Sequence, residues 1–115
     1  MAGIYLDWEY SDVPDHTQEA FETYLIEGYP PGGFLLAVLM NNFVLAAGRA
    51  DYINKQHLGS IARWVLHSAP PASWGSEQKV NDWLSDKDGV RTRFADVVKK
   101  QQTWKILNQK STSTT

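Results

Sequence analysis

Apolar residues recur at helical spacing along most of the chain and predict an all-α, compact bundle of about five helices. Pro14 suits the first turn of the first helix, and Gly28 marks its C-terminal end. A second helix is predicted from Phe34 to Gly48. This segment is apolar nearly all round, which is typical of a buried central helix. Two prolines and two glycines in residues 29–33 separate it from the first helix.

Three further helices are predicted in the C-terminal half. Asn54 is the candidate N-cap of the third helix, Ser76 caps the short fourth, and the fifth runs from about Val90 to Gln102. Helical spacing indicates which of their apolar positions face inward. These positions are Leu58, Ile61, Ala62, Val65, Leu66, Val80, Trp83, Leu84, Val90, Phe94, Val97 and Val98.

The N-terminal segment has a different pattern. Residues 4–10 alternate apolar and polar side chains over their central positions, which is typical of a strand. A lone strand needs a partner, and the other candidate strand is residues 103–107. The sequence therefore leaves open a short two-stranded pairing at the ends of one domain that spans residues 1–110. Residues 111–115 form a polar tail that we expect to be mobile.

Composition excludes several classes of protein. The chain has 115 residues and no cysteine, which excludes a disulfide framework, a thiolate metal site and a cysteine nucleophile. The longest apolar run, residues 34–40, is too short to span a membrane, and the N-terminus lacks a secretory signal pattern. We therefore expect a soluble, cytoplasmic protein that does not bind a membrane. No histidine has the spacing of a metal site, and we expect no cofactor or metal.

Charge is distributed unevenly along the chain. Residues 1–48 contain seven acidic residues and no Lys or Arg, a net charge of −7. Residues 49–115 contain eleven basic and six acidic residues, a net charge of +5. Three explanations stay open: the two halves face each other, the acidic half binds a basic partner, or copies associate head to tail as a homo-oligomer.

Several polar and glycine residues are candidates for binding a ligand or partner. Gly32 and Gly33 precede a helix N-terminus, where backbone N–H groups favour an anion, although the glycines also permit a tight turn. Amides inside an apolar segment need partners, because an unpaired buried amide costs about 1–3 kcal/mol. The candidate polar site consists of Asn41, Asn42, Arg49, Asp51 and Asn54. The alternative, which we favour, is an internal hydrogen-bond network.

Two aromatic regions add further candidates. Trp74, Gly75 and Ser76 place an indole ring at another helix start, where it could stack on a partner or fill a gap between helices. The C-terminal segment interleaves basic residues with Phe94 and Trp104, as in a helix that contacts nucleic acid, but we favour the alternative of a solvated helix face. Its basic residues are Lys87, Arg91, Arg93, Lys99, Lys100, Lys105 and Lys110. No catalytic motif is present, and we expect a protein that is not an enzyme.

Part of the sequence resembles small uncharacterised proteins encoded by tailed bacteriophages. The resemblance covers roughly residues 15–85. It rests on Pro30-Pro31-Gly32-Gly33-Phe34-Leu35, Ala37-Val38-Leu39, Asn41, Arg49-Ala50-Asp51, Asn54, Trp74-Gly75-Ser76, Val80 and Trp83-Leu84. It implies no activity and no catalytic residue, but it implies a phage accessory protein that acts in the cytoplasm of the host cell.

These observations favour a protein that works by binding. The leading hypothesis is a non-enzymatic phage accessory protein that inhibits a host macromolecule, a protein or ribonucleoprotein of an antiviral defence system, in the manner of an anti-CRISPR protein. The first alternative is a small-ligand module, such as a sponge for a nucleotide signal. The second alternative is a nucleic-acid-binding protein that uses the basic C-terminal helix.

Overall fold

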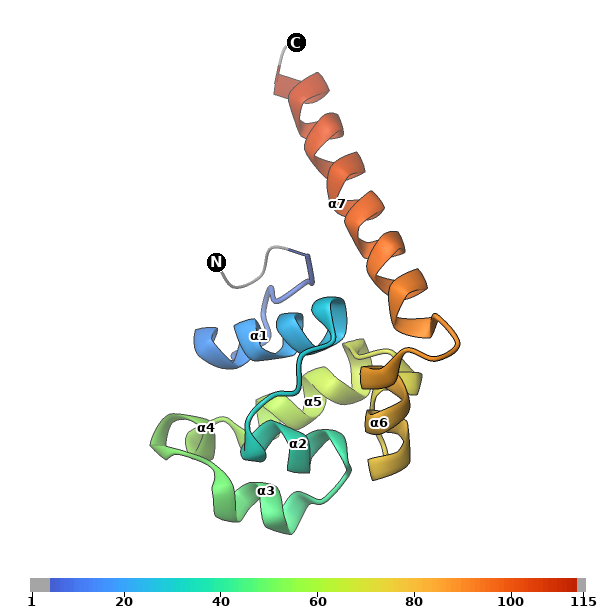
Figure 1. The fold of residues 1–115 in the computed structure, drawn as a ribbon. Coiled ribbons are helices and arrows are strands. Elements are labelled where there is room, and N and C mark those ends of the chain that lie inside the picture. The colour runs from blue at the N-terminus through green and yellow to red at the C-terminus, as the bar shows by residue number, and fades with distance from the viewer. Residues whose placement is uncertain (1–4, 114–115) are drawn as a thin grey trace.

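The computed structural model describes residues 5–113, with side chains except at 106 and 108–113. The prediction of an all-α fold is confirmed, but the described residues form seven α-helices rather than about five (Figure 1). One π-helical turn, η1, and one 3-10 turn, η2, accompany them. In chain order the elements are α1 (Asp15–Glu22), η1 (Thr23–Glu27), α2 (Gly33–Leu39), α3 (Phe43–Arg49), α4 (Tyr52–Gln56), α5 (Leu58–Ser68), η2 (Pro71–Ser73), α6 (Glu77–Ser85) and α7 (Val90–Ser113).

The segment predicted as one buried helix is two helices, and Asn41 and Asn42 separate them. Asn41 adopts a left-handed conformation with φ +64° and ends α2. Its N–H donates to the carbonyl of Val38 at 3.0 Å, and the N–H of Asn42 donates to the carbonyl of Ala37 at 2.8 Å. The Asn42 side chain then accepts from the N–H of Leu45 at 3.2 Å and begins α3. Asparagine suits both positions, since it tolerates the left-handed region and caps helix starts.

A similar break separates α4 from α5. Asp51, rather than the predicted Asn54, is the N-cap of the helix that follows, because its Oδ1 accepts from the N–H of Asn54 at 2.7 Å. Asn54 is instead buried inside α4. The chain turns at His57, and α5 then runs to Ser68, where the two prolines stop it as predicted. Two helices, α4 and α5, therefore replace the single predicted third helix.

The predicted pairing of two terminal strands is wrong. Residues 103–107 lie inside α7, and residues 5–10 are irregular, while residue 4 lies outside the described residues. The backbone of the N-terminal arm is held by a side chain instead of a strand, since the Glu22 carboxylate accepts from the N–H groups of Tyr5 at 2.7 Å and Leu6 at 3.1 Å. Trp8 fixes the arm further by stacking on Trp64, with ring centroids 4.0 Å apart.

The core lies between α1, α2, α5 and α6. Its buried side chains include Phe21, Tyr24, Leu25, Leu35, Leu39, Ile61, Trp64, Val65, Val80 and Trp83. Burying an aliphatic or aromatic side chain of this size contributes about 1.5–3 kcal/mol. The polar groups of two core aromatic residues have hydrogen-bond partners. The Tyr24 hydroxyl donates to the backbone carbonyl of Ser73 at 2.7 Å, and the Trp83 indole N–H donates to the backbone carbonyl of Tyr24 at 3.2 Å. Burial raises the pKa of the Tyr24 phenol well above its ordinary value.

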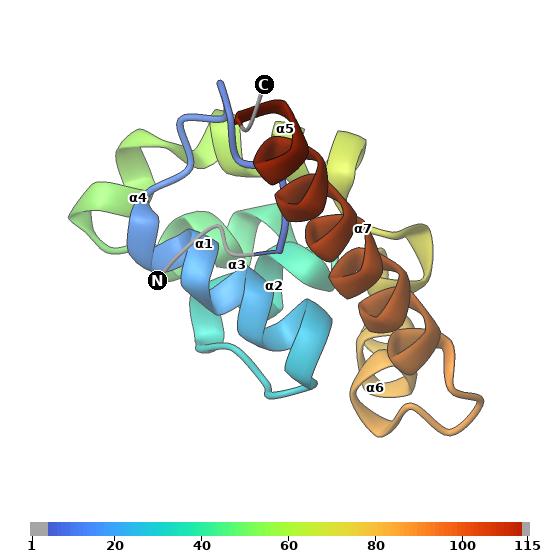
Figure 2. The ribbon, with the colours of Figure 1, turned by 90° about the horizontal axis from the view of Figure 1, so that it is seen from above.

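α7 is the longest helix, and it leaves the body of the molecule (Figures 1 and 2). Near its start, Ala95 and Val98 pack on Ile26, and Phe94 lies against the edge of the core. Val90 and Val97 were expected to face inward but are exposed, because only one side of α7 contacts the body. The helix continues to Ser113, beyond the predicted end at Gln102, and residues 114–115 of the predicted tail lie outside the described residues. Within the described chain, no helix has the length and apolarity that crossing a membrane requires.

Candidate functional site

The structure divides the predicted site residues between two neighbouring regions. Gly32, Gly33, Arg49 and Asn54 line a polar cleft between α1, the start of α2 and the α3–α4 junction, and Asp51 contacts the lining residue His16. Asn41 and Trp74 line an apolar groove between α5 and the α2–α3 pair. Asn42, Gly75 and Ser76 have structural roles instead. Asn42 and Ser76 are helix N-caps, and the N–H of Gly75 donates to the carbonyl of Leu39 at 2.7 Å.

The polar cleft has a volume of about 330 Å³. Its cationic wall is Arg49, whose Nη1 lies 3.5 Å from the carbonyl oxygen of Gly33. A Cβ added at Gly33 would lie 3.4 Å from Nη1, an ordinary contact distance, so the space beside Arg49 does not require a glycine there. The same holds for Gly32, whose backbone is extended with φ −64° and where a Cβ would meet nothing within 4 Å. Neither glycine therefore acts as a left-handed hinge.

A chain of polar contacts forms the floor of this cleft. The hydroxyl of Thr17 donates to Oδ1 of Asn54 at 2.5 Å, and both residues are buried. Nδ2 of Asn54 lies 3.4 Å from Nε2 of His16, and the same nitrogen of His16 lies 3.5 Å from Oδ2 of Asp51. Asn54 is thus part of an internal network, whereas Asn41 and Asn42, the amides for which the sequence favoured such a network, are exposed. Arg49 and His16 remain exposed and could meet an anionic group.

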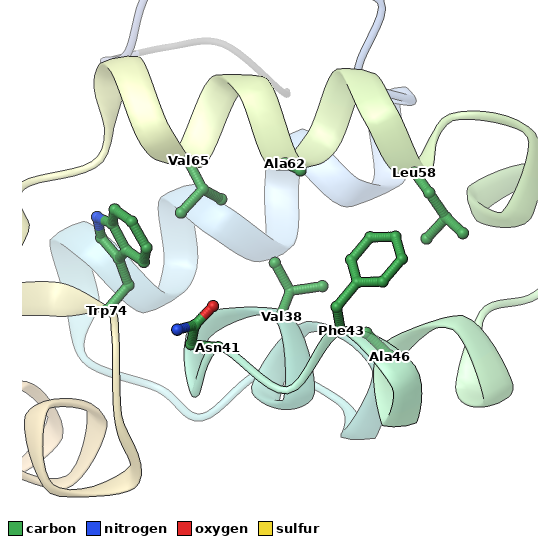
Figure 3. Close-up of a pocket in the computed structure, with 8 residues that line it drawn as sticks. All are labelled: Val38, Asn41, Phe43, Ala46, Leu58, Ala62, Val65 and Trp74. Carbon is green, nitrogen blue, oxygen red and sulfur yellow. The ribbon is translucent and has the colours of Figure 1, made fainter.

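The apolar groove lies beside this cleft and has a volume of about 80 Å³. Figure 3 shows Leu58, Ala62 and Val65 of α5 facing Val38 and Phe43, with Trp74 at one end near Asn41. Asn41 is the one polar side chain among the eight residues that line the groove. The groove can therefore accept an apolar side chain, while the Asn41 amide at its edge offers hydrogen bonds.

Three consecutive apolar residues at the start of α3 are exposed beside this groove. The exposed fractions are 59% for Phe43, 84% for Val44 and 39% for Leu45. The sequence predicted these residues as part of a buried helix, and that prediction is wrong here. Tyr52 and Ile53 of α4 and Leu66 of α5 are also exposed. Exposed apolar side chains that lie together in this way are candidates for an interaction surface.

Trp74 has a further unusual feature. Its indole nitrogen is buried and has no hydrogen-bond partner among the described residues. Gly75 follows with φ +120°, a backbone conformation that favours glycine and lets the chain reverse before α6. Ser76 then accepts from the N–H of Lys79 at 3.1 Å, which confirms it as the N-cap of α6. The Trp74-Gly75-Ser76 segment therefore builds a helix start and places the indole ring at the end of the groove.

Sequence reasoning missed His16, Thr17 and the exposed run. The first two come from α1 and reach the cleft across 37 residues of chain, so no local pattern could have indicated them. The helix start at the exposed run had a local signal, because Asn42 directly precedes Phe43 and asparagine is a strong N-cap, but the exposure itself had none.

The described residues contain no group of three or more His, Asp or Glu side chains that could hold a metal ion. Comparisons with protein-family models, with curated proteins and with solved structures give no match to this chain.

Proposed function

We propose that this chain is a non-enzymatic binding protein that docks on a macromolecular partner through its α3 surface. The α3 surface consists of Phe43, Val44 and Leu45 together with the apolar groove that they border. The observation that carries the proposal is the exposure of three consecutive apolar side chains next to a groove with an almost wholly apolar lining. Surfaces of this kind bind proteins, because covering them removes apolar area from water.

The shape of the groove defines the chemistry of the partner. A volume of about 80 Å³ accommodates part of one apolar side chain rather than a nucleotide or a cofactor. We therefore expect the partner to be a protein that inserts an aliphatic or aromatic side chain between α5 and α3, while Phe43 and Val44 pack on its surface. Aromatic anchors in such pockets dominate the binding energy of many interfaces.

The resemblance to small tailed-phage proteins suggests which partner this is. We propose a host protein or ribonucleoprotein of an antiviral defence system, bound and inhibited in the host cytoplasm. The chain need not catalyse a reaction, because covering a functional surface of the partner is sufficient for inhibition. The α3 surface supports the binding step, and the phage resemblance supports the choice of a host target.

A pull-down from bacterial lysate with matched variants tests this proposal. Phe43→Asp and Val44→Asp place a charge on the α3 surface without opening the core, since both side chains are exposed. Tyr29→Asp is the control, because Tyr29 is equally exposed but lies in the loop before α2. We expect the wild-type chain and Tyr29→Asp to retain one specific host protein and the two α3 variants to lose it. Equal retention by all four chains would refute docking through α3.

The polar cleft supports a second candidate function, binding of a small anionic ligand such as a nucleotide signal. This function is suggested by Arg49 and His16, which both line a space of about 330 Å³. A thermal-shift panel of nucleotides tests this function, with Arg49→Ala as the variant and Lys79→Ala, an exposed lysine on α6, as the control. A nucleotide that stabilises the wild type and Lys79→Ala but not Arg49→Ala supports the function. If no phosphate-bearing ligand raises the unfolding temperature, the function is excluded.

A further inference from the structure

α7 presents an outward face that nothing in the described part of the chain covers. Val90, Val97 and Trp104 recur every seven residues, and Leu107 lies one turn after Trp104. All four side chains are exposed, Trp104 at 64%. These residues lie on the side of the helix opposite Ala95 and Val98, which pack on the body. We call Val90, Arg93, Val97, Lys100, Trp104 and Leu107 the outward face of α7.

The charge of α7 restricts what can cover this face. The helix carries six basic residues and one acidic residue, Asp96. Arg93 and Lys100 lie between the apolar positions of the outward face itself. A second α7 would bring like charges together, which disfavours a coiled coil of two such helices. The occupant must therefore be acidic and must offer apolar contact to Trp104.

The N-terminal arm of this chain has that chemistry. Asp7, Glu9, Tyr10 and Asp12 form an acidic surface along one wall of a cleft of about 260 Å³ beside α5. All four are exposed, and Tyr10 is 95% exposed. Among the described side chains, the ion pairs are His16 with Asp51 and Arg91 with Asp86, so no Lys or Arg pairs with this surface. Arg63 and His67 of α5 line the opposite wall.

The acidic surface and the outward face of α7 cannot meet within one chain. α7 runs away from the body after its first turns (Figure 1). The α7 side chains that pack with Tyr5 and Leu6 of the arm include Ala95 and Val98, which do not belong to the outward face. A helix of 24 residues is about 36 Å long, which lets its exposed half reach a neighbouring molecule. Two copies related by a two-fold axis would make this contact twice and leave neither surface uncovered.

We propose that two copies of this chain form a reciprocal dimer, in which the outward face of each α7 docks on the acidic surface of the other copy. Trp104 packs against Tyr10 at the cleft between the arm and α5. Lys100 and Arg93 neutralise Glu9 and Asp12. This assembly does not use the α3 surface, so the dimer and the proposed function can be tested independently.

Sedimentation velocity of the full chain tests the dimer over a wide concentration range at low and high salt. We expect a dimer at low salt whose dissociation constant rises with salt, because exposed charge pairs are screened. Trp104→Asp and Lys100→Glu should each give monomers with unchanged circular dichroism. Lys87→Glu, in the exposed turn before α7, is the control and should remain dimeric.

Mixing two variants gives the decisive result. Lys100→Glu alone and Glu9→Lys alone each place like charges at both contacts of the dimer and should be monomeric. Their equimolar mixture restores opposite charges at one contact and keeps the native pairing at the other, so it should form a heterodimer. A monomeric wild type, a dimer that Trp104→Asp leaves intact, or a mixture that stays monomeric would each overturn the proposal. Binding of nucleic acid by a monomeric wild type, lost in Lys100→Glu, would assign α7 to nucleic acid instead.

Discussion

The hydroxyl of Thr17 donates to the side-chain oxygen of Asn54 over 2.5 Å and joins α1 to α4 through a buried contact. Neither residue can reach water to replace this bond. The contact also orients Asn54 toward His16, whose ring nitrogen lies 3.4 Å from the other end of the amide. The floor of the polar cleft is therefore held by one hydrogen bond between helices that are distant in sequence.

Thr17→Val should destabilise the protein, because it leaves the Asn54 oxygen buried without a donor. We expect the free energy of unfolding to fall by about 1–3 kcal/mol in urea titrations. Thr103→Val is the control, since its hydroxyl bonds to the carbonyl of Lys99 on an exposed part of α7. The control should change stability by less than about 0.5 kcal/mol. Equal effects of the two substitutions would show that the buried bond contributes nothing specific.

Local signals in the sequence predicted some elements well. Gly28 ends the first helical segment in a left-handed conformation, and Ser76 begins α6, because both depend only on neighbouring backbone groups. The segment from Phe34 to Gly48 was misjudged for a physical reason. Apolar residues all round a helix usually indicate burial on every side, but here the residues after Asn42 are exposed.

The candidate site was likewise predicted only where its residues are close together in sequence. Arg49, Asp51 and Asn54 were expected to form one candidate polar site; Arg49 and Asn54 do line one cleft, and Asp51 contacts its lining residue His16. Thr17 and His16 were not predicted, since only the packing of α1 against α4 brings them there. The role of Asn41 could have been predicted, because an Asn-Asn pair inside an apolar segment can supply both a left-handed stop and an N-cap.

Substitution of Asn41 tests its role as a helix stop. Asn41→Ala should lower the free energy of unfolding by about 1–2 kcal/mol, because alanine is strained in the left-handed region. Asn41→Gly should be neutral or stabilising, since glycine adopts this conformation freely. Asn81→Ala, on the exposed side of α6, is the control and should not destabilise. If Asn41→Ala were as stable as Asn41→Gly in urea, the helix stop would not depend on the conformation of residue 41.

The start of α7 should respond to pH through Asp86. Its carboxylate accepts hydrogen bonds from the Thr92 hydroxyl and from the N–H groups of Arg91 and Thr92, and these bonds lower its pKa below the ordinary value of 3.8. A pKa lowered by folding means that the stabilisation is present above the ordinary value and is lost as pH falls through the folded value. Asp86→Asn should therefore flatten the loss of stability with acid below about pH 4.

Acid titrations followed by circular dichroism check this prediction. Asparagine tolerates the left-handed backbone of residue 86, so the substitution removes the charge without adding strain. Asp88→Asn is the control, because the Asp88 carboxylate makes no hydrogen bond or ion pair with the described residues. The control should keep the pH dependence of the wild type. An Asp86→Asn curve that coincides with the wild type would show that this carboxylate does not couple folding to pH.

The most direct test of docking through the α3 surface is site-specific photo-crosslinking in a bacterial host. A photoreactive phenylalanine analogue is introduced at Val44, and separately at Tyr29, whose side chain is also exposed but lies outside the α3 surface. We predict that illumination links position 44 to one discrete host protein and that position 29 gives no such product. A discrete product at position 29 without one at position 44, or none at either, would contradict docking through the α3 surface.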